Sequence, residues 1–151
     1  MSDADPPRYA ALQLAQASVV YLHRSPVVVD CSVMAALIFD EPAAADAERL
    51  VAGKALCAPS LLPYEMANVA RNKQRAGLSV DQVLAALAEF AEQPLQSITP
   101  KTDEVLMLAL RYNLSAYDAS YLWVAARLLA PLATLDLRLA DAARQHLGVE
   151  E

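Results

Sequence analysis

Short apolar runs alternate along the chain with longer segments whose apolar residues recur at helical spacing. The run Val27–Val29 is β-branched throughout and follows Pro26, which is typical of a strand buried on both faces. Further short strands are predicted at residues 55–58, 95–98 and 131–135. Helices are predicted at residues 32–39, 43–52, 60–76, 79–93, 100–113 and 115–129, and from 137 to about 146. Short strands that alternate with helices predict the α/β class, with a parallel sheet covered on both faces.

Residues typical of helix ends support these boundaries. Ser32 and Ser60 are candidate helix N-caps, and Ser79 with Gln82 has the spacing of a capping box. The three glycines, at positions 53, 77 and 148, each follow a predicted helix. No Gly-rich phosphate loop or dinucleotide fingerprint is therefore present, which disfavours a nucleotide cofactor. Residues 149–151 are predicted to form at most a vestigial fifth strand.

The pattern divides the chain into a domain at residues 26–151 and an N-terminal extension at residues 1–25. Within the extension, residues 8–24 have weak helical spacing and predict an accessory helix packed on the surface of the domain. The start of the chain lacks the basic and apolar blocks of a signal peptide. No apolar run reaches the roughly 20 residues needed to span a bilayer. We therefore expect a soluble, cytoplasmic protein.

Composition indicates a folded protein and argues against one class of nucleic-acid binding. Hydrophobic residues make up 56% of the 151 residues, so the chain is expected to fold around a substantial core. The formal net charge of −6 argues against nucleic-acid binding through the overall electrostatic field. Cys31 and Cys57 both lie in predicted core segments, where they are expected to act as small apolar side chains in a reducing compartment.

Four acidic residues stand beside these apolar segments. Asp30 follows the first strand and Asp136 follows the last, while Glu65 and Asp118 lie in the first turns of predicted helices. In an open parallel sheet, strand C-termini and helix N-termini meet at the same edge, where ligands bind. The four side chains are therefore expected to converge on one cleft, although about a hundred residues separate the first from the last.

A cluster of carboxylates beside a core is costly to desolvate unless a positive charge meets it. No lysine, arginine or histidine occupies a comparable position, and the two histidines, His23 and His146, lie away from the acids in the sequence. The pattern therefore predicts a bound cation. Oxygen ligands without histidine or cysteine suit Mg²⁺ or Mn²⁺ rather than zinc. Such an ion activates water and neutralises a scissile phosphate, so hydrolysis of a phosphodiester is the expected chemistry.

Three polar residues are candidates for supporting this site. Ser32 lies two residues after Asp30, Thr134 lies two before Asp136, and Asn68 lies one helical turn after Glu65. They could orient the acids or the water around an ion, or be an ordinary helix cap, strand residue and surface residue respectively. The acids themselves have an alternative role as helix N-caps, which explains Glu65 poorly. Asp141 lies within the last predicted helix and is expected to be solvated.

At these residues the chain resembles the PIN-domain family, specifically the VapC-type toxin ribonucleases. The resemblance covers about residues 27–149 and rests on four segments in the same order and spacing: Val27–Ser32, Pro63–Asn68, Ser115–Leu122 and Ala133–Leu139. It implies a three-layer α/β/α sandwich and a Mg²⁺- or Mn²⁺-dependent endoribonuclease. It also implies that Asp30, Glu65, Asp118 and Asp136 form the catalytic and metal-binding quartet.

The resemblance has further implications for partners. Members of the family cut RNA, often structured RNA such as tRNA, usually form homodimers, and are held inactive by a cognate antitoxin that enters the acidic groove. Candidate contacts to RNA phosphates are Arg71, Lys73, Arg75 and Arg138, with Arg144 nearby in the sequence. These cations are also explained by solvated helix faces.

Two other functions fit parts of the pattern. A catalytically inactive PIN-like module would bind RNA or a protein, but the complete set of four acids disfavours it. A phosphatase with Asp30 as nucleophile normally has a second aspartate two residues later, where this chain has Ser32.

Overall fold

The computed structural model describes residues 24–148. The predictions for residues 8–23, which include His23, and for residues 149–151 lie outside the described residues.

Within the described residues, four parallel strands form one sheet in the order β3-β2-β1-β4. The strands are β1 (Pro26–Val29), β2 (Ala55–Pro59), β3 (Leu95–Ile98) and β4 (Leu132–Ala133). Val28 of β1 pairs with Cys57 of β2 on one side and with Leu132 of β4 on the other. This central position explains the unbroken β-branched run, because a strand with neighbours on both edges and helices on both faces has no solvated side.

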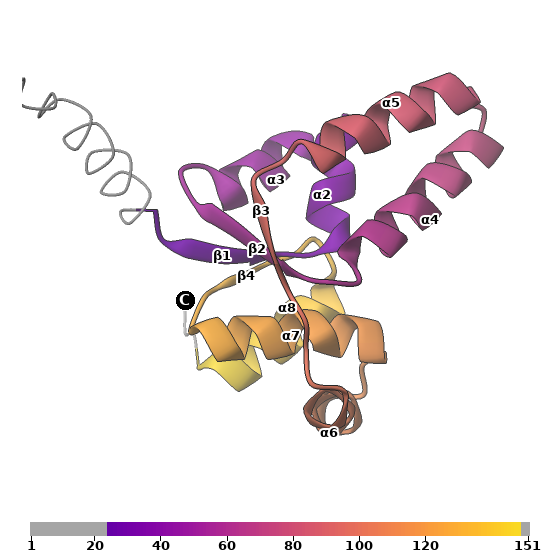
Figure 1. Ribbon diagram of the computed structural model, residues 1–151. Coiled ribbons are helices and arrows are strands. Elements are labelled where there is room, and N and C mark those ends of the chain that lie inside the picture. Colours follow the sequence, from indigo (N-terminus) through magenta and orange to yellow (C-terminus); the bar gives the residue numbers. More distant parts are fainter. Residues whose placement is uncertain (1–23, 149–151) are drawn as a thin grey trace, which may run out of the picture.

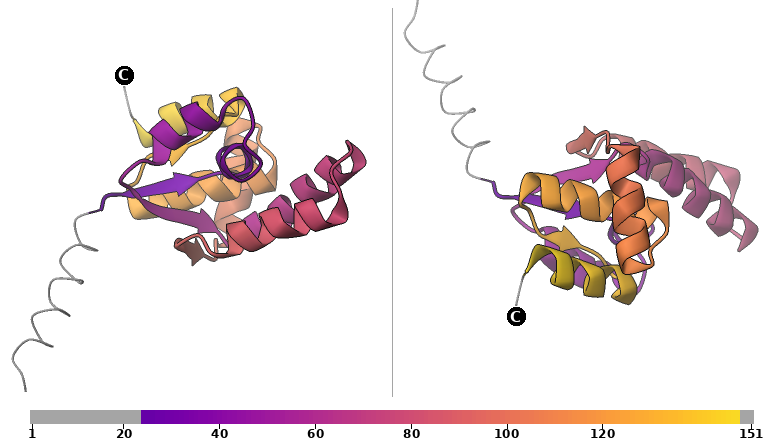
Figure 2. Two further views of the ribbon diagram at one scale, coloured as in Figure 1. Left: turned by 90° about the horizontal axis from the view of Figure 1, so that it is seen from above. Right: turned by 90° about the horizontal axis from the view of Figure 1, so that it is seen from below.

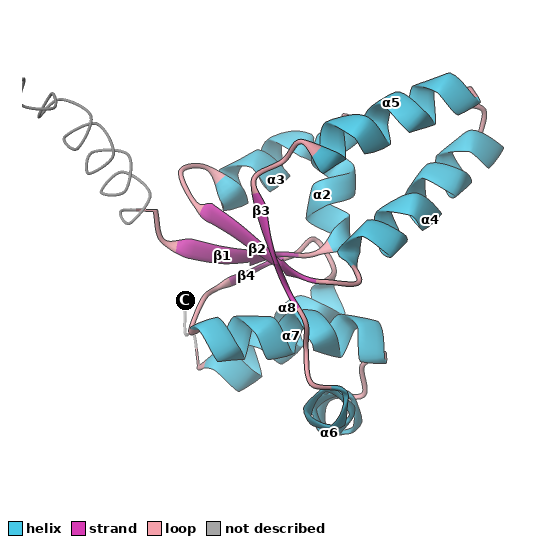
Figure 3. Ribbon diagram, viewed as in Figure 1, coloured by secondary structure: helices cyan, strands magenta, loops and turns pink. Residues whose placement is uncertain are grey.

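The helices cover both faces of this sheet. Within the described residues they are α2 (Cys31–Ile38), α3 (Ala44–Val51), α4 (Leu62–Arg75), α5 (Val80–Ala91), α6 (Thr102–Tyr112), α7 (Ala116–Leu128) and α8 (Leu137–Leu147). In Figure 1, α2 to α5 lie above the sheet and α6 to α8 lie below it, with α4 and α5 projecting as a hairpin. The views in Figure 2 and the colouring in Figure 3 show the same helix–sheet–helix layering. The predicted α/β/α sandwich is confirmed.

Helix α7 lies closest to the sheet. Residues 119–125 are all buried, so this helix contacts protein around nearly its whole circumference. Its alanines let it approach β1 and β2, and Tyr121 and Leu122 fill the space beside them. The packing fixes the first turn of α7, where Asp118 stands, relative to the sheet. No helix among residues 24–148 is long and apolar enough to cross a membrane.

Three local predictions were wrong. Ser32 is not the N-cap of α2, because Asp30 takes that position and its carboxylate accepts a hydrogen bond from the Val33 amide. Ser60 does not cap α4: its amide donates to the Ile98 carbonyl beyond the end of β2, and the helix starts after Leu61 without a side-chain cap. The capping box at Ser79 is confirmed.

The third correction concerns the last strand. It was expected to span residues 131–135, but β4 ends at Ala133. The next backbone amides are taken by side chains: Leu135 donates to the Ser32 hydroxyl and Asp136 donates to the Thr134 hydroxyl. Side-chain acceptors of this kind compete with ladder hydrogen bonds, so the strand gives way to a turn. Thr134 therefore lies in this turn rather than on the strand.

Candidate active site

The four predicted acids lie at the carboxyl edge of the sheet. Strand order reverses between β1 and β4, and this switch point is where open α/β sheets bind ligands. Asp30 directly follows β1, and Asp136 caps the helix after β4. Glu65 and Asp118 stand in the first turns of α4 and α7.

Asp30 is held by the most extensive set of hydrogen bonds in this group. Its Oδ1 accepts from the Ser32 hydroxyl at 2.6 Å and from the Val33 amide at 3.0 Å. Its Oδ2 accepts from the Thr134 hydroxyl. Each hydroxyl also accepts a backbone amide from the turn after β4, namely Leu135 for Ser32 and Asp136 for Thr134. Because the hydroxyl oxygens are occupied as acceptors, their protons point to Asp30, and this arrangement suits the ionised carboxylate.

This network also links the two strand ends. Ser32 and Thr134, predicted as supporting residues, both bridge Asp30 to the turn that carries Asp136. The structure therefore favours the supporting role for them over an isolated cap or strand residue.

Burial makes the charge on Asp30 costly. Asp30 is only 5% exposed, and desolvation raises its pKa above the ordinary value despite the opposing hydrogen bonds from Ser32, Thr134 and Val33. The negative charge of Asp136 raises the pKa of Asp30 further, because the two carboxylates repel each other. A positive charge near this pair would relieve both effects.

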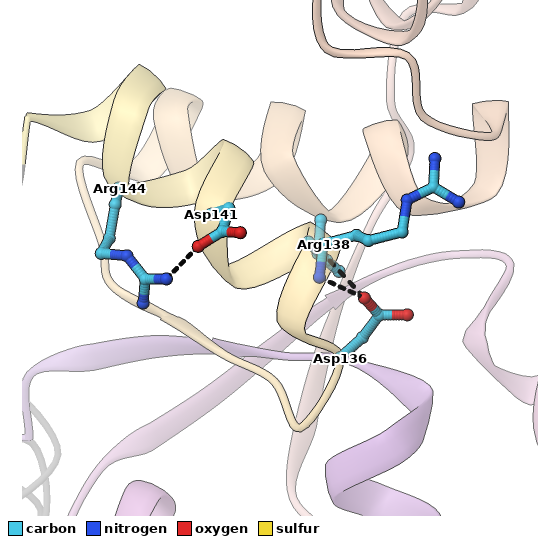
Figure 4. A network of polar contacts seen from close by, with 5 residues as sticks. Asp136, Arg138, Asp141 and Arg144 are labelled. Carbon is cyan, nitrogen blue, oxygen red and sulfur yellow. Dashed lines mark hydrogen bonds and ion pairs between the residues drawn. The ribbon is translucent and has the colours of Figure 1, made fainter.

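Asp136 serves as the N-cap of α8. Its Oδ1 accepts from the amides of Arg138 at 2.8 Å and Leu139 at 3.0 Å, while its other oxygen extends outward (Figure 4). The Arg138 guanidinium turns away from this carboxylate and donates to the Asn113 carbonyl at 2.8 Å. Asp30 and Asp136 are thus both helix caps, as the alternative interpretation expected, and still present oxygens at the sheet edge.

Glu65 and Asp118 occupy the neighbouring helix starts. The buried Tyr121 hydroxyl donates to Glu65 Oε2, which ties α7 to α4. Desolvation raises the pKa of Glu65, the Tyr121 hydrogen bond lowers it, and the charges of Asp118 and Asp30 raise it again. Asp118 is not the cap of α7: Ser115 is, and its hydroxyl donates to Asp118 Oδ2 at 2.8 Å.

Sequence reasoning missed the roles of Tyr121 and Ser115. Tyr121 follows Asp118 by three residues, a spacing that places both on one helical face. Ser115 precedes Asp118 by three residues. Both spacings are visible in the sequence, but the contact of Tyr121 with Glu65 joins helices that are 56 residues apart.

The predicted RNA-binding cations differ in whether their charged groups are already paired with other residues. Lys73 forms an ion pair with Glu41 and lies over the Phe39 ring at 5.6 Å, so its ammonium group is already engaged. Arg144 pairs with Asp141 on the outer surface of α8, as Figure 4 shows, which agrees with a solvated Asp141. Arg71 and Arg75 are exposed one turn apart on α4.

Other titratable groups lie outside this cluster. The Tyr112 hydroxyl lies 2.9 Å from His146 Nδ1, between α6 and α8. Cys57 is buried, and Cys31 is half-buried with its thiol 3.8 Å from Met66 Sδ. Burial, with the charges of Glu65, Asp30 and Glu41, raises the pKa of Cys31 to about 12, so its thiol stays protonated and apolar as expected.

The donor set fits a hard divalent cation. All four side chains offer carboxylate oxygens, and no ion pair within residues 24–148 involves any of them. In the described part of the chain, no three acidic, histidine or cysteine side chains are drawn together into a ready ion-binding group. Like charges repel, and each carboxylate is instead turned toward a neutral donor: Glu65 toward Tyr121, Asp118 toward Ser115, and Asp136 toward helix amides.

Replacing Thr134 by valine is expected to reduce RNA cleavage by about 10- to 100-fold, the usual effect of removing a group that orients a ligand. The change removes a hydrogen bond to Asp30 and the acceptor for the Asp136 amide. Steady-state cleavage rates measure it, with Thr134→Ser as the matched control that keeps the hydroxyl. Equal rates for Thr134→Val and the wild type would show that the bridge to Asp30 is dispensable.

Comparisons with known proteins identify the family of the chain. A family model described as "PIN domain" matches residues 27–145. Ribonuclease VapC3 of Pyrobaculum aerophilum is 33% identical over 121 residues, which cover 76% of this chain and 92% of that protein. Ribonuclease VapC9 of Mycobacterium tuberculosis is 33% identical over 120 residues, which cover 76% of this chain and 89% of that protein.

A solved structure supports the same assignment. The crystal structure of PAE2754 from Pyrobaculum aerophilum superposes with a TM-score of 0.62 at 28% identity, covering 82% of this chain and 88% of that one. These matches leave no support for the phosphatase alternative. The chain belongs to the PIN-domain family and, within it, to the VapC-type ribonucleases.

Proposed function

We propose that this chain is a Mg²⁺- or Mn²⁺-dependent endoribonuclease whose site consists of Asp30, Glu65, Asp118 and Asp136. The observation that carries the proposal is the buried Asp30. Two hydroxyls and an amide donate to its carboxylate, the charge of Asp136 raises its pKa, and no ion pair within residues 24–148 balances it. We assign this activity to residues 26–151, and the family match over residues 27–145 supports that boundary.

The acids would hold the ion, with Asp30 and Asp136 on the sheet side and Glu65 and Asp118 on the helix side. When bound, a hard divalent ion lowers the pKa of water and neutralises charge on a phosphate. Ser32 and Thr134 keep the Asp30 oxygens fixed, and Tyr121 holds one Glu65 oxygen. Asp30 is buried and Glu65 is half-buried, which strengthens their attraction for a cation.

RNA is the proposed substrate, and the substrate class includes structured RNA such as tRNA. Arg71 and Arg75 are exposed on α4, the helix that carries Glu65, and are suited to contact phosphates beyond the acids. Arg138 contributes less, because its guanidinium is bonded to the Asn113 carbonyl. With a net charge of −6, binding depends on these local contacts rather than on the overall field.

The chain would act as the toxin of a toxin–antitoxin pair in the cytoplasm. A basic side chain of a cognate antitoxin is a suitable occupant of the acidic groove, because clustered carboxylates favour an arginine fork. A homodimer is supported by α6, where Leu106, Met107 and Leu110 are 53%, 66% and 70% exposed. Neighbouring exposed apolar side chains of this size are typical of a protein–protein contact.

The proposal is tested by RNA cleavage in the presence and absence of divalent ions. The wild type is expected to cleave RNA with Mg²⁺ or Mn²⁺ and to stop in EDTA. Asp118→Asn is expected to lower the rate by about 100-fold or more, the order found when one electrostatic group is removed from a site. Asn keeps an oxygen to accept the Ser115 hydroxyl, so the start of α7 is preserved.

Asp141→Asn is the matched control, because Asp141 is an exposed acid paired only with Arg144 on the surface of α8. It is expected to cleave like the wild type. Full activity of Asp118→Asn, or undiminished cleavage in EDTA, would contradict the proposal. A wild type that binds RNA but does not cleave it with any divalent ion would instead revive the inactive module, which no observation on this chain favours.

A further inference from the structure

A pocket adjoins the acidic cluster on the side of α4. It has a volume of about 400 Å³ and is lined by Leu61, Tyr64, Glu65, Asn68 and Tyr117. That volume falls within the roughly 300–1,000 Å³ typical of small-ligand sites. A pocket of about 430 Å³ between α6, α7 and α8 contains none of the four acids. The pocket at Glu65 contains one of the four acids, so a substrate held by the acids would reach it.

Helical geometry builds this pocket from the two elements that carry Glu65 and Asp118. Leu61, Tyr64, Glu65 and Asn68 follow the spacing i, i+3, i+4, i+7, so they form one stripe along the start of α4. Tyr117 projects from α7 one turn before Tyr121, whose hydroxyl is bonded to Glu65. This hydrogen bond joins α7 to α4, and Tyr117 lines the same pocket as the stripe.

Two aromatic rings in this pocket face solvent. Tyr64 is 79% exposed and Tyr117 is 65% exposed, whereas Tyr121, next to them, is 1% exposed. Single exposed apolar side chains need no explanation, but two tyrosines on one pocket beside a candidate catalytic acid form a surface for a planar ligand. Bases of single-stranded RNA bind to proteins by stacking on such rings.

We propose that Tyr64 and Tyr117 form a stacking subsite for one unpaired nucleobase of the RNA, next to the phosphate that is cleaved. The inference rests on the proposed ribonuclease site and adds to it a contact that selects unpaired RNA. Among residues 24–148, no lysine or arginine lines the pocket, so it suits an uncharged base rather than a phosphate. Asn68 supplies an amide that both donates and accepts hydrogen bonds at the edge of that base.

Stacking is tested apart from catalysis with a single-stranded 12-nucleotide RNA that carries the fluorescent base 2-aminopurine, placed at each position in turn. The full chain carrying Asp30→Asn binds this RNA in the presence of Mg²⁺. At one or two positions, fluorescence is expected to be quenched as the base stacks on a ring. Adding Tyr64→Leu and Tyr117→Leu is expected to remove the quenching, whereas Phe at both positions retains it. Leucine keeps an apolar side chain without an aromatic face, and both sites are exposed, so neither pair disturbs the core.

Cleavage kinetics in the otherwise wild-type chain give the second readout. The Leu pair is expected to raise KM by about tenfold, the lower range for loss of base–aromatic stacking, with a smaller change in kcat. The Phe pair is expected to stay within about twofold of the wild type in KM. Leu84→Ala, a change at a 58% exposed residue of α5, is the surface control.

Quenching that survives in the Leu pair, or a KM equal to that of the wild type, overturns the subsite. So does a Leu pair that changes only the oligomeric mass measured by light scattering, because the rings would then cover a protein contact. Failure of the proposed function gives a different result, since wild-type cleavage would then be absent whatever occupies positions 64 and 117.

Discussion

Replacing Asp30 by asparagine is expected to lower RNA cleavage by about 100- to 1,000-fold while leaving the protein folded. The substitution preserves shape: an amide oxygen still accepts from Ser32 and Val33, so the cap of α2 remains. What it removes is the negative charge at the most buried position of the cluster, where Asp30 is 5% exposed. Removing a buried negative charge weakens the binding of a cation more than removing an exposed one does.

The same substitution is expected to keep or increase stability at neutral pH. Burial raises the pKa of Asp30 above its ordinary value of 3.8, so the folded state binds this proton more tightly than the unfolded state. The contribution of Asp30 to the free energy of unfolding is therefore greatest below pH 3.8. It falls as pH rises through the raised pKa and is constant above that point. Asparagine carries no such penalty, which offsets the loss of the hydrogen bond from Thr134.

Two measurements separate these effects. Cleavage rates of Asp30→Asn are compared with those of Asp81→Asn, an exposed first-turn acid of α5 that is expected to behave as wild type. Urea unfolding between pH 3 and pH 8, with EDTA present, gives the difference in free energy of unfolding between Asp30→Asn and the wild type. That difference is expected to grow with pH. A marked loss of stability at neutral pH, with activity lost in parallel, would instead make Asp30 a purely structural cap.

Divalent ions are expected to stabilise the wild type more than any variant of the acidic quartet. An ion that binds only the folded state adds about 2.7 kcal/mol at a concentration of 100 Kd. For a chain of this length, that corresponds to a rise in Tm of about 5–10 °C. The ion offsets the desolvation of Asp30 and the mutual repulsion of the carboxylates, both of which raise the pKa values of Asp30 and Glu65.

Thermal unfolding in EDTA and in Mn²⁺ measures this effect. Asp30→Asn is expected to melt at or above the wild-type Tm in EDTA and below it in Mn²⁺, so the order reverses when the ion is added. Asp81→Asn is the control and is expected to shift with the wild type. Because the net charge is −6, divalent ions also act on the protein nonspecifically. Equal shifts in Asp30→Asn and the wild type would assign the whole effect to that screening.

Much of the fold was predictable because its signals are local. The β-branched run at residues 27–29, the glycines after helices and the capping box at Ser79 each depend on neighbours within a few residues. The rule that strand ends and helix starts share one edge then predicted that Asp30, Glu65, Asp118 and Asp136 lie at that edge. The errors at Ser32 and Thr134 arose where hydrogen bonds join distant segments, because the Ser32 hydroxyl accepts from the Leu135 amide and the Thr134 hydroxyl donates to Asp30. At Ser60 the backbone amide donates to the distant Ile98 carbonyl, and the N-cap of α4 is the next residue.

The sequence by itself therefore determined the order of the elements, the α/β class and the acids that end up at the sheet edge. Only the tertiary structure decided how those acids are held. It joined Thr134 to Asp30 across 104 residues and Tyr121 to Glu65 across 56, engaged Lys73 with Glu41, and set Tyr117 opposite Tyr64 on one pocket. The physical reason is that periodicity records which face of an element is buried, whereas a hydrogen bond, ion pair or pocket exists only once two distant elements have packed.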